Sequence, residues 1–180
     1  MTIRKIHITG GPGSGKTTLA RRIAASLDLP HFELDGLALR LDAEGRPFAE
    51  MAAETQRIAR LGGWVSEGAY LGLAGPLLRE ADLIIWVDIP WRVASYRIVW
   101  RHIRAELARN NRFPGWRRLY RFWRWSGRYY GNQNSGGLDG YGVPTTRDTV
   151  RQILEPHRDK LVVCKSNGEI TTMLRKRIGV

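Results

Sequence analysis

The sequence predicts an α/β fold, in which a parallel sheet of five strands lies between two layers of helices. Short segments with strand-like patterns alternate with longer segments that carry apolar residues at helical spacing. Residues 82–90 form an almost continuously apolar run, as in a central strand covered on both faces. A third observation is the segment from Gly10 to Thr17, which follows the pattern G-x-x-x-x-G-K-[ST]. Because strand–helix–strand connections are right-handed, these elements predict a parallel, doubly covered sheet.

The glycine-rich segment is the phosphate-binding P-loop, and its neighbours support this interpretation over a chance glycine-rich turn. Residues 3–9 alternate like a strand, and residues 18–27 have helical spacing. The glycines allow successive backbone N–H groups to turn inward around a polyphosphate at the start of a helix. Lys16 is expected to reach the β- and γ-phosphates, and the Thr17 hydroxyl to ligate Mg²⁺. The predicted nucleotide-binding residues are Gly11, Pro12, Gly13, Ser14, Gly15, Lys16, Thr17 and Thr18.

Three acidic residues follow predicted strands, at the sheet edge where ligands bind in α/β folds. Asp35 follows the strand 31–34, and we expect it to orient a substrate hydroxyl, act as a base or hold Mg²⁺ through water, unless it caps the next helix. Glu67 follows the strand 64–66, and we expect it to hold Mg²⁺ through water or accept a proton, unless it lies in a surface turn. Asp88 resembles a Walker B aspartate by pattern. However, if Glu67 is the metal ligand, Asp88 is expected instead to anchor the loop that follows it.

Two further residues of this part of the chain are weaker candidates. Arg40 is placed to meet an acceptor phosphate, although a solvated arginine is favoured. Tyr70 is expected to pack against a substrate or against the helix that follows it.

The predicted helix 91–108 carries arginines at helical spacing. Ile98 or Val99, Ile103 and Leu107 form its predicted apolar face, and Arg97, Arg101 and Arg104 lie on another face. Neighbouring arginines repel one another unless water or an anion lies between them. Because the helix leaves a strand end that faces the phosphate loop, we expect this stripe to stabilise a phosphoryl group in transfer, with a solvated face as the alternative.

The next segment is basic and aromatic. No acidic residue occurs between Arg109 and Leu138, and residues 112–130 interleave arginines with phenylalanine, tryptophan and tyrosine. We expect a helix over 114–130 and a loop over 131–142. Such a segment forms a mobile lid over ATP, binds single-stranded nucleic acid, or lies on an anionic membrane surface.

The remaining chain completes the alternation of helices and strands. A helix over 145–159 begins at Thr145 or Thr146, and the last strand covers 161–165 with Cys164 as a small core residue. Residues 166–168 are expected to form a tight turn before a helix over 169–178, whose buried stripe comprises Ile170, Met173, Leu174 and Ile178.

Composition limits the class of protein. A length of 180 residues predicts one domain, 1–180, with a lid-like insertion at about 109–145. No apolar run reaches the ~20 residues of a membrane span, the start lacks a signal-peptide pattern, and one cysteine favours the reducing cytoplasm. The formal charge is +12, and 24 of the 29 basic residues are arginine. Nucleotides, nucleic acid and acidic membrane are therefore the favoured partners. The four histidines show no metal-ligand spacing.

These residues together resemble the adenylate kinase-like branch of P-loop kinases, most closely the DNA topology modulation protein (FlaR-like) family. The segment 64–70 (WVSEGAY) is similar to that family's W-[IV]-[IV]-D-G-N-Y, with Glu67 for Asp and Ala69 for Asn. The segment 88–90 (DIP) followed by 97–101 (RIVWR) is similar to D-V-P and R-I-V-G-R of adenylate kinases. The predicted lid lacks zinc-binding cysteines, and residues 36–63 show none of the adenylate kinase signature for AMP.

The resemblance implies roles for several residues. It places Arg97 and Arg101 beside the lid, where one lies against the ATP base and the other reaches the phosphates. It also places Ser166, Asn167 and Gly168 in a backbone loop around adenine. The implied function is transfer of the γ-phosphoryl group of Mg·ATP to a nucleoside, a nucleoside monophosphate or another small hydroxyl compound. The alternatives are a nucleotide-dependent nucleic-acid-binding protein that uses residues 112–130, and an inactive relative that binds nucleotide without turnover.

Overall fold

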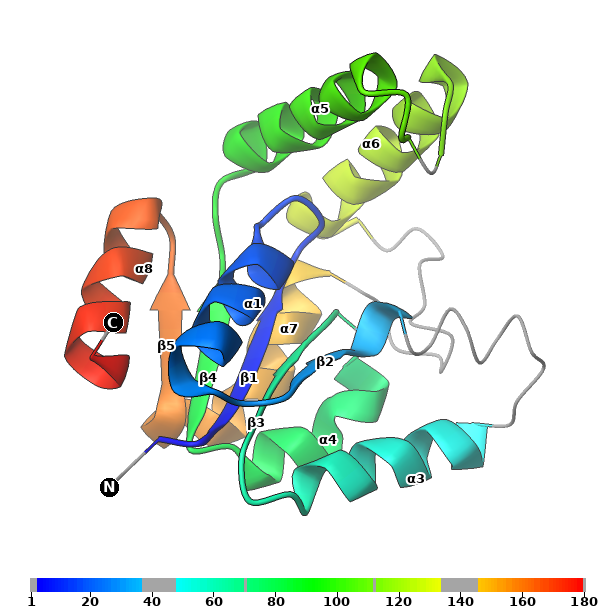
Figure 1. Ribbon diagram of the computed structural model, residues 1–180. Helices are drawn as coiled ribbons and strands as arrows, with labels where there is room; N and C mark the ends of the chain where they lie inside the picture. The colour runs from blue at the N-terminus through cyan, green and yellow to red at the C-terminus, as the bar shows by residue number, and fades with distance from the viewer. Residues whose placement is uncertain (1–2, 37–47, 70, 112, 134–145, 180) are drawn as a thin grey trace.

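The computed structural model describes residues 3–36, 48–69, 71–111, 113–133 and 146–179 of the chain (Figure 1). Strands and helices alternate along most of it, as predicted. The strands are β1 (Lys5–Gly10), β2 (His31–Glu33), β3 (Trp64–Glu67), β4 (Leu83–Val87) and β5 (Leu161–Cys164). The helices are α1 (Lys16–Leu27), α3 (Phe48–Ala59), α4 (Leu71–Glu80), α5 (Trp91–Leu107), α6 (Trp116–Tyr130), α7 (Arg147–Leu154) and α8 (Asn167–Met173). A 3-10 helix, η1 (Glu155–Lys160), follows α7, and a π-helix, η2 (Leu174–Ile178), follows α8.

The strands form one parallel sheet in the order β2-β3-β1-β4-β5. In the register of β1, Ile8 lies beside Glu67 of β3 and Ile85 of β4. The carboxyl ends of these neighbouring strands therefore meet at one edge, directly beside the loop that follows β1. The five-stranded parallel sheet between helices confirms the predicted α/β fold.

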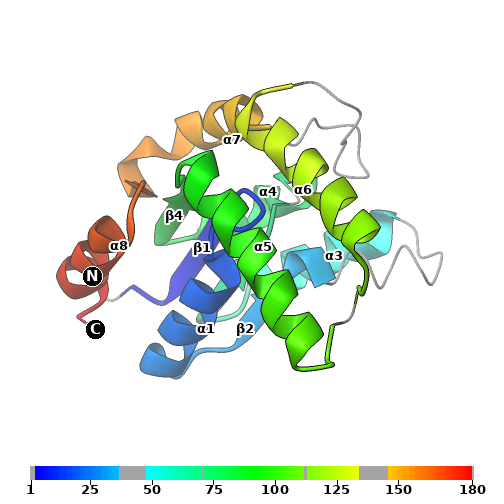
Figure 2. The same ribbon diagram turned by 90° about the horizontal axis from the view of Figure 1, so that it is seen from above.

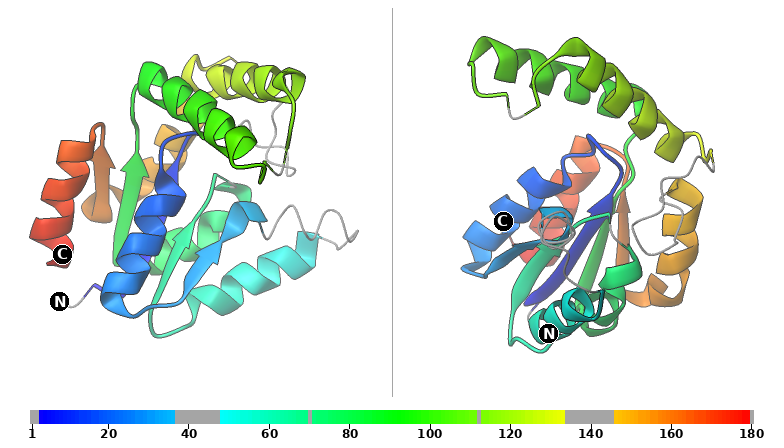
Figure 3. Two further views of the ribbon diagram at one scale, coloured as in Figure 1. Left: turned by 45° about the horizontal axis from the view of Figure 1, so that its top comes forward. Right: turned by 90° about the vertical axis from the view of Figure 1, so that its right-hand side faces the viewer.

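Each face of the sheet is covered by its own helices because side chains alternate along the strands. Ile6 and Ile8 of β1 belong to a core cluster with buried residues of α1 and α8. Trp64 of β3 and Trp86 of β4 belong to a second cluster with buried residues of α3, α4 and α7. Figure 2 and Figure 3 show these helices on opposite sides of the strands. The core therefore consists of two layers separated by the sheet.

Helices α5 and α6 pack together above the carboxyl edge of the sheet, and we call this pair the α5–α6 arm (Figure 3). Trp91 of α5 packs against Trp123 and Tyr130 of α6, with ring centroids 5.5 and 5.2 Å apart. The indole N–H of Trp123 donates a hydrogen bond of 2.6 Å to the Ser95 hydroxyl. The arm begins at residue 91, before the predicted lid-like insertion at 109–145, of which residues 112 and 134–145 lie outside the described residues. The division into domain and insertion stays a prediction.

Several expected elements differ from the structure. Ile98 is buried as predicted, but Leu107 is 79% exposed because the end of α5 extends beyond the core. The predicted turn 166–168 is the beginning of α8, whose N-cap is Ser166 and whose first residues are Asn167 and Gly168. Thr146 is the N-cap of α7, and Thr145 lies outside the described residues. Cys164 is buried and free, as predicted.

Candidate functional site

The P-loop connects β1 to α1, and its glycines are required by close contacts with the α5–α6 arm. Gly13 and Gly15 have φ values of +77° and +94°, a conformation that favours glycine. A Cβ atom at Gly13 would lie 2.7 Å from the Ala94 carbonyl oxygen of α5. The loop therefore has the glycine-dependent backbone conformation that the sequence pattern predicts, and its tight packing against α5 is an additional requirement for glycine.

Asp35 lies beside the P-loop, as its place after the second predicted strand led us to expect, and there it meets Lys16. Lys16 is the first residue of α1, and its Nζ lies 3.3 Å from Asp35 Oδ2. The other carboxylate oxygen of Asp35 accepts a hydrogen bond of 2.7 Å from the Ala69 N–H. Asp35 thus joins the end of β2 to the turn after β3, and its carboxylate remains partly exposed at 27%.

Thr17 and Glu67 form the second polar contact at this edge. The Thr17 hydroxyl donates a hydrogen bond of 2.8 Å to Glu67 Oε1. Glu67 is fully buried, and its Oε2 has no hydrogen-bond partner among the residues that the structure describes. Burial raises the pKa of Glu67, while Lys16 and the Thr17 hydroxyl act in the opposite direction. Because one buried oxygen of this carboxylate has no partner among the described residues, the site can receive a further positively charged or hydrogen-bonding group.

This pair of oxygen groups fits Mg²⁺. A hydroxyl and a carboxylate beside a phosphate loop are the hard oxygen ligands that Mg²⁺ prefers. Within the described ranges, no group of three or more His, Cys, Asp and Glu side chains is arranged to hold a metal. Because Mg²⁺ usually keeps several waters and binds substrate phosphates, two protein ligands are sufficient for such a site.

Arg97 connects the P-loop to the start of α8. Its Nη1 donates a hydrogen bond of 2.7 Å to the Ser14 carbonyl oxygen, and its Nη2 donates one of 2.8 Å to Asn167 Oδ1. The structure therefore brings together Arg97, the P-loop and the predicted adenine-binding segment 166–168. Arg101 and Arg104 lie further along α5, are exposed, and have no hydrogen bond or ion pair with another described residue.

Two tyrosines at the end of α6 contact the P-loop, and the sequence interpretation did not assign them this role. The Tyr130 hydroxyl donates a hydrogen bond of 2.9 Å to the Pro12 carbonyl oxygen. A Cβ atom at Gly11 would collide with the ring of Tyr129. Burial raises the pKa of both phenols, so both stay protonated at neutral pH. No local sequence signal distinguishes these tyrosines from the other aromatic residues of α6.

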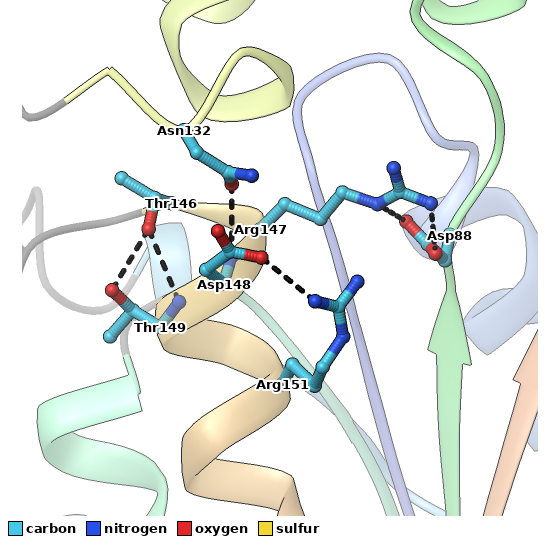
Figure 4. A network of polar contacts seen from close by, with 7 residues as sticks. All are labelled: Asp88, Asn132, Thr146, Arg147, Asp148, Thr149 and Arg151. Carbon is cyan, nitrogen blue, oxygen red and sulfur yellow. Dashed lines mark hydrogen bonds and ion pairs between the residues drawn. The ribbon is translucent and has the colours of Figure 1, made fainter.

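Asp88 forms an ion pair with Arg147 at the end of β4 (Figure 4). Arg147 Nε and Nη2 each lie 2.6 Å from one carboxylate oxygen of Asp88. The Asp88 backbone N–H donates a hydrogen bond of 2.9 Å to the Cys164 carbonyl oxygen. Both carboxylate oxygens of Asp88 are thus occupied by Arg147 of α7, and not by the following loop that the sequence analysis expected Asp88 to anchor; the sequence did not indicate this role of Arg147. Arg40 and Tyr70, the two weaker candidates, lie outside the described residues.

Comparison with known proteins agrees with this arrangement. The model of the ATPase family associated with various cellular activities (AAA) matches residues 6–69, from β1 through the P-loop to the turn after Glu67. The chain is 36% identical over 112 residues to a cytidylate kinase of Pyrococcus horikoshii, covering 53% of this chain and 56% of the relative. It is 30% identical over 128 residues to a cytidylate kinase of Halobacterium salinarum, covering 57% and 61% respectively. The aligned part of the chain thus spans little more than half the length of these curated relatives.

A solved structure supports the fold over the whole chain. The shikimate kinase from Acinetobacter baumannii, in complex with shikimate, superposes with a TM-score of 0.51 at 14% identity and covers 99% of this chain and 94% of its own. At this identity the likeness shows the fold alone. The resemblance to the FlaR-like family stays a prediction. The chain therefore has the P-loop NTPase fold and is similar in sequence to cytidylate kinases over about half its length.

Proposed function

We propose that the protein is an ATP-dependent phosphotransferase of the nucleotide kinase type, which transfers the γ-phosphoryl group of Mg·ATP to a small acceptor. The observation that carries this proposal is the meeting of Lys16, Thr17, Asp35 and Glu67 at the carboxyl edge of the sheet. A phosphate loop alone suits any nucleotide-binding protein. A second carboxylate held beside the P-loop lysine adds a group that can receive an acceptor, and this favours transfer over binding alone.

The phosphate side of the site has a defined set of groups. The P-loop N–H groups and Lys16 bind the phosphates, and Thr17 and Glu67 hold Mg²⁺, with Glu67 acting directly or through water. Bound Mg²⁺ supplies positive charge that offsets the charge of the phosphates. Arg97 and the segment 166–168 bind the base end of ATP, and Arg101 reaches the phosphates when the arm closes over the nucleotide. These roles follow the resemblance, and the contacts of Arg97 with Ser14 and Asn167 support them.

The two carboxylates, Glu67 and Asp35, have different roles in the proposed reaction. Glu67 is buried and already accepts a hydrogen bond from Thr17, which suits a metal ligand. Asp35 is partly exposed and is fixed by the Ala69 N–H, which suits a group that positions a hydroxyl of the acceptor. Catalysis then consists mainly of placement and charge neutralisation.

A panel of acceptors tests the proposal. Release of ADP from Mg·ATP is measured with CMP, other nucleoside monophosphates, nucleosides and small hydroxyl compounds, starting with CMP because cytidylate kinases are among the similar proteins. We expect turnover that rises with one of these acceptors. Lys16→Ala should lower the rate by at least about a hundredfold, because it removes a charge that acts on the transferring group. Arg22→Ala, at an exposed position further along the same helix α1, is the matched control and should leave the rate unchanged.

The same assay separates the alternatives. Stimulation of ATP hydrolysis by DNA, with DNA affinity that falls steeply as salt rises, would favour the nucleic-acid-binding function of residues 112–130. Binding of Mg·ATP without transfer to any acceptor would indicate an inactive relative. An unchanged rate in Lys16→Ala would remove this lysine from the mechanism.

A further inference from the structure

The α5–α6 arm carries nearly all of the exposed large hydrophobic side chains of the described residues. Nine of the ten such side chains belong to the arm and its connecting turn, and the tenth is Val163 on β5. Those on the arm are Val93, Tyr96, Trp100, Leu107, Phe113, Trp116, Tyr120, Phe122 and Trp125. Exposed apolar groups gathered in one part of a protein mark an interaction surface, whereas scattered ones do not.

The same arm carries most of the charge of the protein. Residues 91–131 contain eleven arginines and one acidic residue, Glu106, which gives a formal charge of +10 out of +12 for the whole chain. Glu106 is occupied within the turn, where its Oε1 accepts hydrogen bonds from the Gly115 N–H and the Asn111 amide, each 2.9 Å long. The arm therefore carries a large excess of positive charge that its single acidic side chain cannot balance.

Figure 3 shows the α5–α6 arm extending above the sheet, and two of its most exposed apolar side chains lie at its far end, where α5 ends and α6 begins. Leu107 is 79% exposed and Trp116 is 64% exposed. Leu107 lies thirteen positions after Ala94, which contacts the P-loop, and this separation corresponds to roughly 20 Å of helix. The end of the arm is thus well separated from the phosphate loop, and its use as a docking surface leaves that loop accessible.

A depression lined by arginine and aromatic side chains lies beside this end of the arm. Trp116, Arg117, Tyr120, Arg121 and Arg124 line a depression of about 520 Å³ along α6. Helical spacing places these three arginines on one side of the helix, next to the face that packs on α5 through Trp123. Guanidinium groups arranged in this way suit phosphate groups, and the two aromatic rings provide apolar walls.

We propose that the end of the α5–α6 arm docks on an anionic phospholipid surface. Tryptophan, tyrosine and leucine side chains enter the boundary between head groups and acyl chains, while the arginines bind lipid phosphates. The proposal concerns binding to the surface only, because no helix of the described residues is long and apolar enough to cross a bilayer. It does not rest on the phosphotransferase activity.

Charge and side-chain type decide among the possible partners. A second copy of this chain would bring two arms of charge +10 together, which electrostatic repulsion opposes. Single-stranded nucleic acid satisfies the arginines but uses flat π-faces for base stacking. The aliphatic side chain of Leu107, 79% exposed at the end of the arm, offers no such face, whereas a lipid interface buries it as readily as an aromatic ring. An anionic membrane surface therefore accounts for more of the exposed residues than either alternative.

Sedimentation with lipid vesicles tests this proposal. The full-length protein is mixed with vesicles of phosphatidylcholine alone and of equimolar phosphatidylcholine and phosphatidylglycerol. We expect binding to the anionic vesicles only, and weaker binding as salt rises from about 0.1 M to about 0.5 M, because salt screens exposed charges.

Two pairs of variants separate the apolar and the charged contributions. Leu107→Ser combined with Trp116→Ser should weaken binding by roughly tenfold to a hundredfold, given the usual gain from burying large apolar side chains. Arg117→Gln combined with Arg121→Gln should weaken it by about tenfold or more. The controls are Val163→Ser, which is exposed outside the arm, and Arg175→Gln combined with Arg177→Gln on η2. Neither control should change binding, and thermal unfolding of each variant confirms that it is folded.

Three results would overturn the proposal. The first is no sedimentation with anionic vesicles. The second is binding of fluorescent oligothymidylate that the arm variants weaken, without any binding to vesicles. The third is self-association of the protein through the arm, again without binding to vesicles.

Discussion

Removal of the Arg147 side chain should destabilise the protein, because it leaves the buried carboxylate of Asp88 without a partner. The Asp88 side chain is only 2% exposed, whereas that of Arg147 is 34% exposed. Both oxygens of Asp88 accept bonds of 2.6 Å from Arg147. In Arg147→Ala, this charge loses both bonds while water has little access to it.

The magnitude follows from the unequal exposure of the two partners. Breaking a fully buried ion pair costs about 3–5 kcal/mol, and breaking an exposed pair costs about 0–1 kcal/mol. Because Arg147 is about a third exposed, we expect a loss of roughly 2–3 kcal/mol in the free energy of unfolding. For a chain of this length, 1 kcal/mol corresponds to about 2–4 °C, so the melting temperature should fall by roughly 4–12 °C.

Thermal unfolding followed by circular dichroism measures this difference, and α7 contains its own control. Arg151 pairs with Asp148 at 2.9 Å on the exposed side of the same helix (Figure 4). Arg151→Ala should therefore lower stability by less than about 1 kcal/mol. Asp88→Asn should cost less than Arg147→Ala, since the remaining arginine has access to water. A melting temperature that falls equally in Arg147→Ala and Arg151→Ala would refute this explanation of the pair.

Three further predictions concern the P-loop and the core. Gly13→Ala should lower ATP affinity at least about tenfold, since a side chain at φ +77° is strained and collides with the Ala94 carbonyl group. Calorimetric titration measures this affinity. The control Gly62→Ala, where the added methyl group meets open space, should bind ATP normally. Tyr130→Phe should lower the free energy of unfolding by about 1 kcal/mol, because it removes the hydrogen bond to the Pro12 carbonyl group. Denaturant unfolding measures this difference. The control Tyr96→Phe, at an exposed position, should leave the free energy of unfolding unchanged. Burial lowers the pKa of His7 from 6.5 to about 4, so the unfolded chain binds a proton first as pH falls. The contribution of neutral His7 to the free energy of unfolding should be fully present above pH 6.5 and should fall by about 2–3 kcal/mol towards pH 4. In His7→Gln, the free energy of unfolding should fall less steeply with pH. The same pH dependence in both proteins would show that His7 is not responsible.

The sequence was sufficient for the parts of the site that depend on local patterns and on topology. Lys16 and Thr17 belong to the P-loop motif, Asp35 follows β2, and Glu67 is the last residue of β3. Because the carboxyl ends of such strands share an edge, local pattern and sheet order together place these four residues beside one another. The contacts Lys16–Asp35 and Thr17–Glu67 show this outcome.

The remaining contacts depend on packing between distant parts of the chain. Tyr130 and Pro12 are 118 residues apart, and Arg147 and Asp88 are 59 residues apart, so no local pattern indicates either pair. Leu107 has the periodicity of a buried residue, but periodicity does not show where the core ends. Helix α4 contains Gly72, Gly75 and Pro76, which weaken the helical signal and left its bounds undefined.

The start of α8 is a different case, because the sequence held a signal that the turn interpretation did not use. Ser166 and Glu169 have the spacing of a capping box, S-x-x-E, and the Ser166 hydroxyl accepts a hydrogen bond of 3.2 Å from the Glu169 N–H. This cap fixes the first turn of α8 and so places Asn167 against Arg97. A polar sequence with glycine therefore begins a helix here.

The fixed position of Arg97 bears on how the proposed site would bind a nucleotide. A guanidinium group has five N–H donors, and the bonds to Ser14 and Asn167 use two of them. The side chain is thus held in place by protein acceptors while donors remain for a ligand, so little further ordering is needed when a nucleotide binds. Arg101 is exposed and has no such anchors among the described residues, and its participation requires movement of the arm or ordering of its side chain. The two arginines that the resemblance treats as a pair therefore differ physically: two hydrogen bonds hold Arg97 in place, whereas Arg101 has none with the described residues, and its proposed role requires closure of the complex.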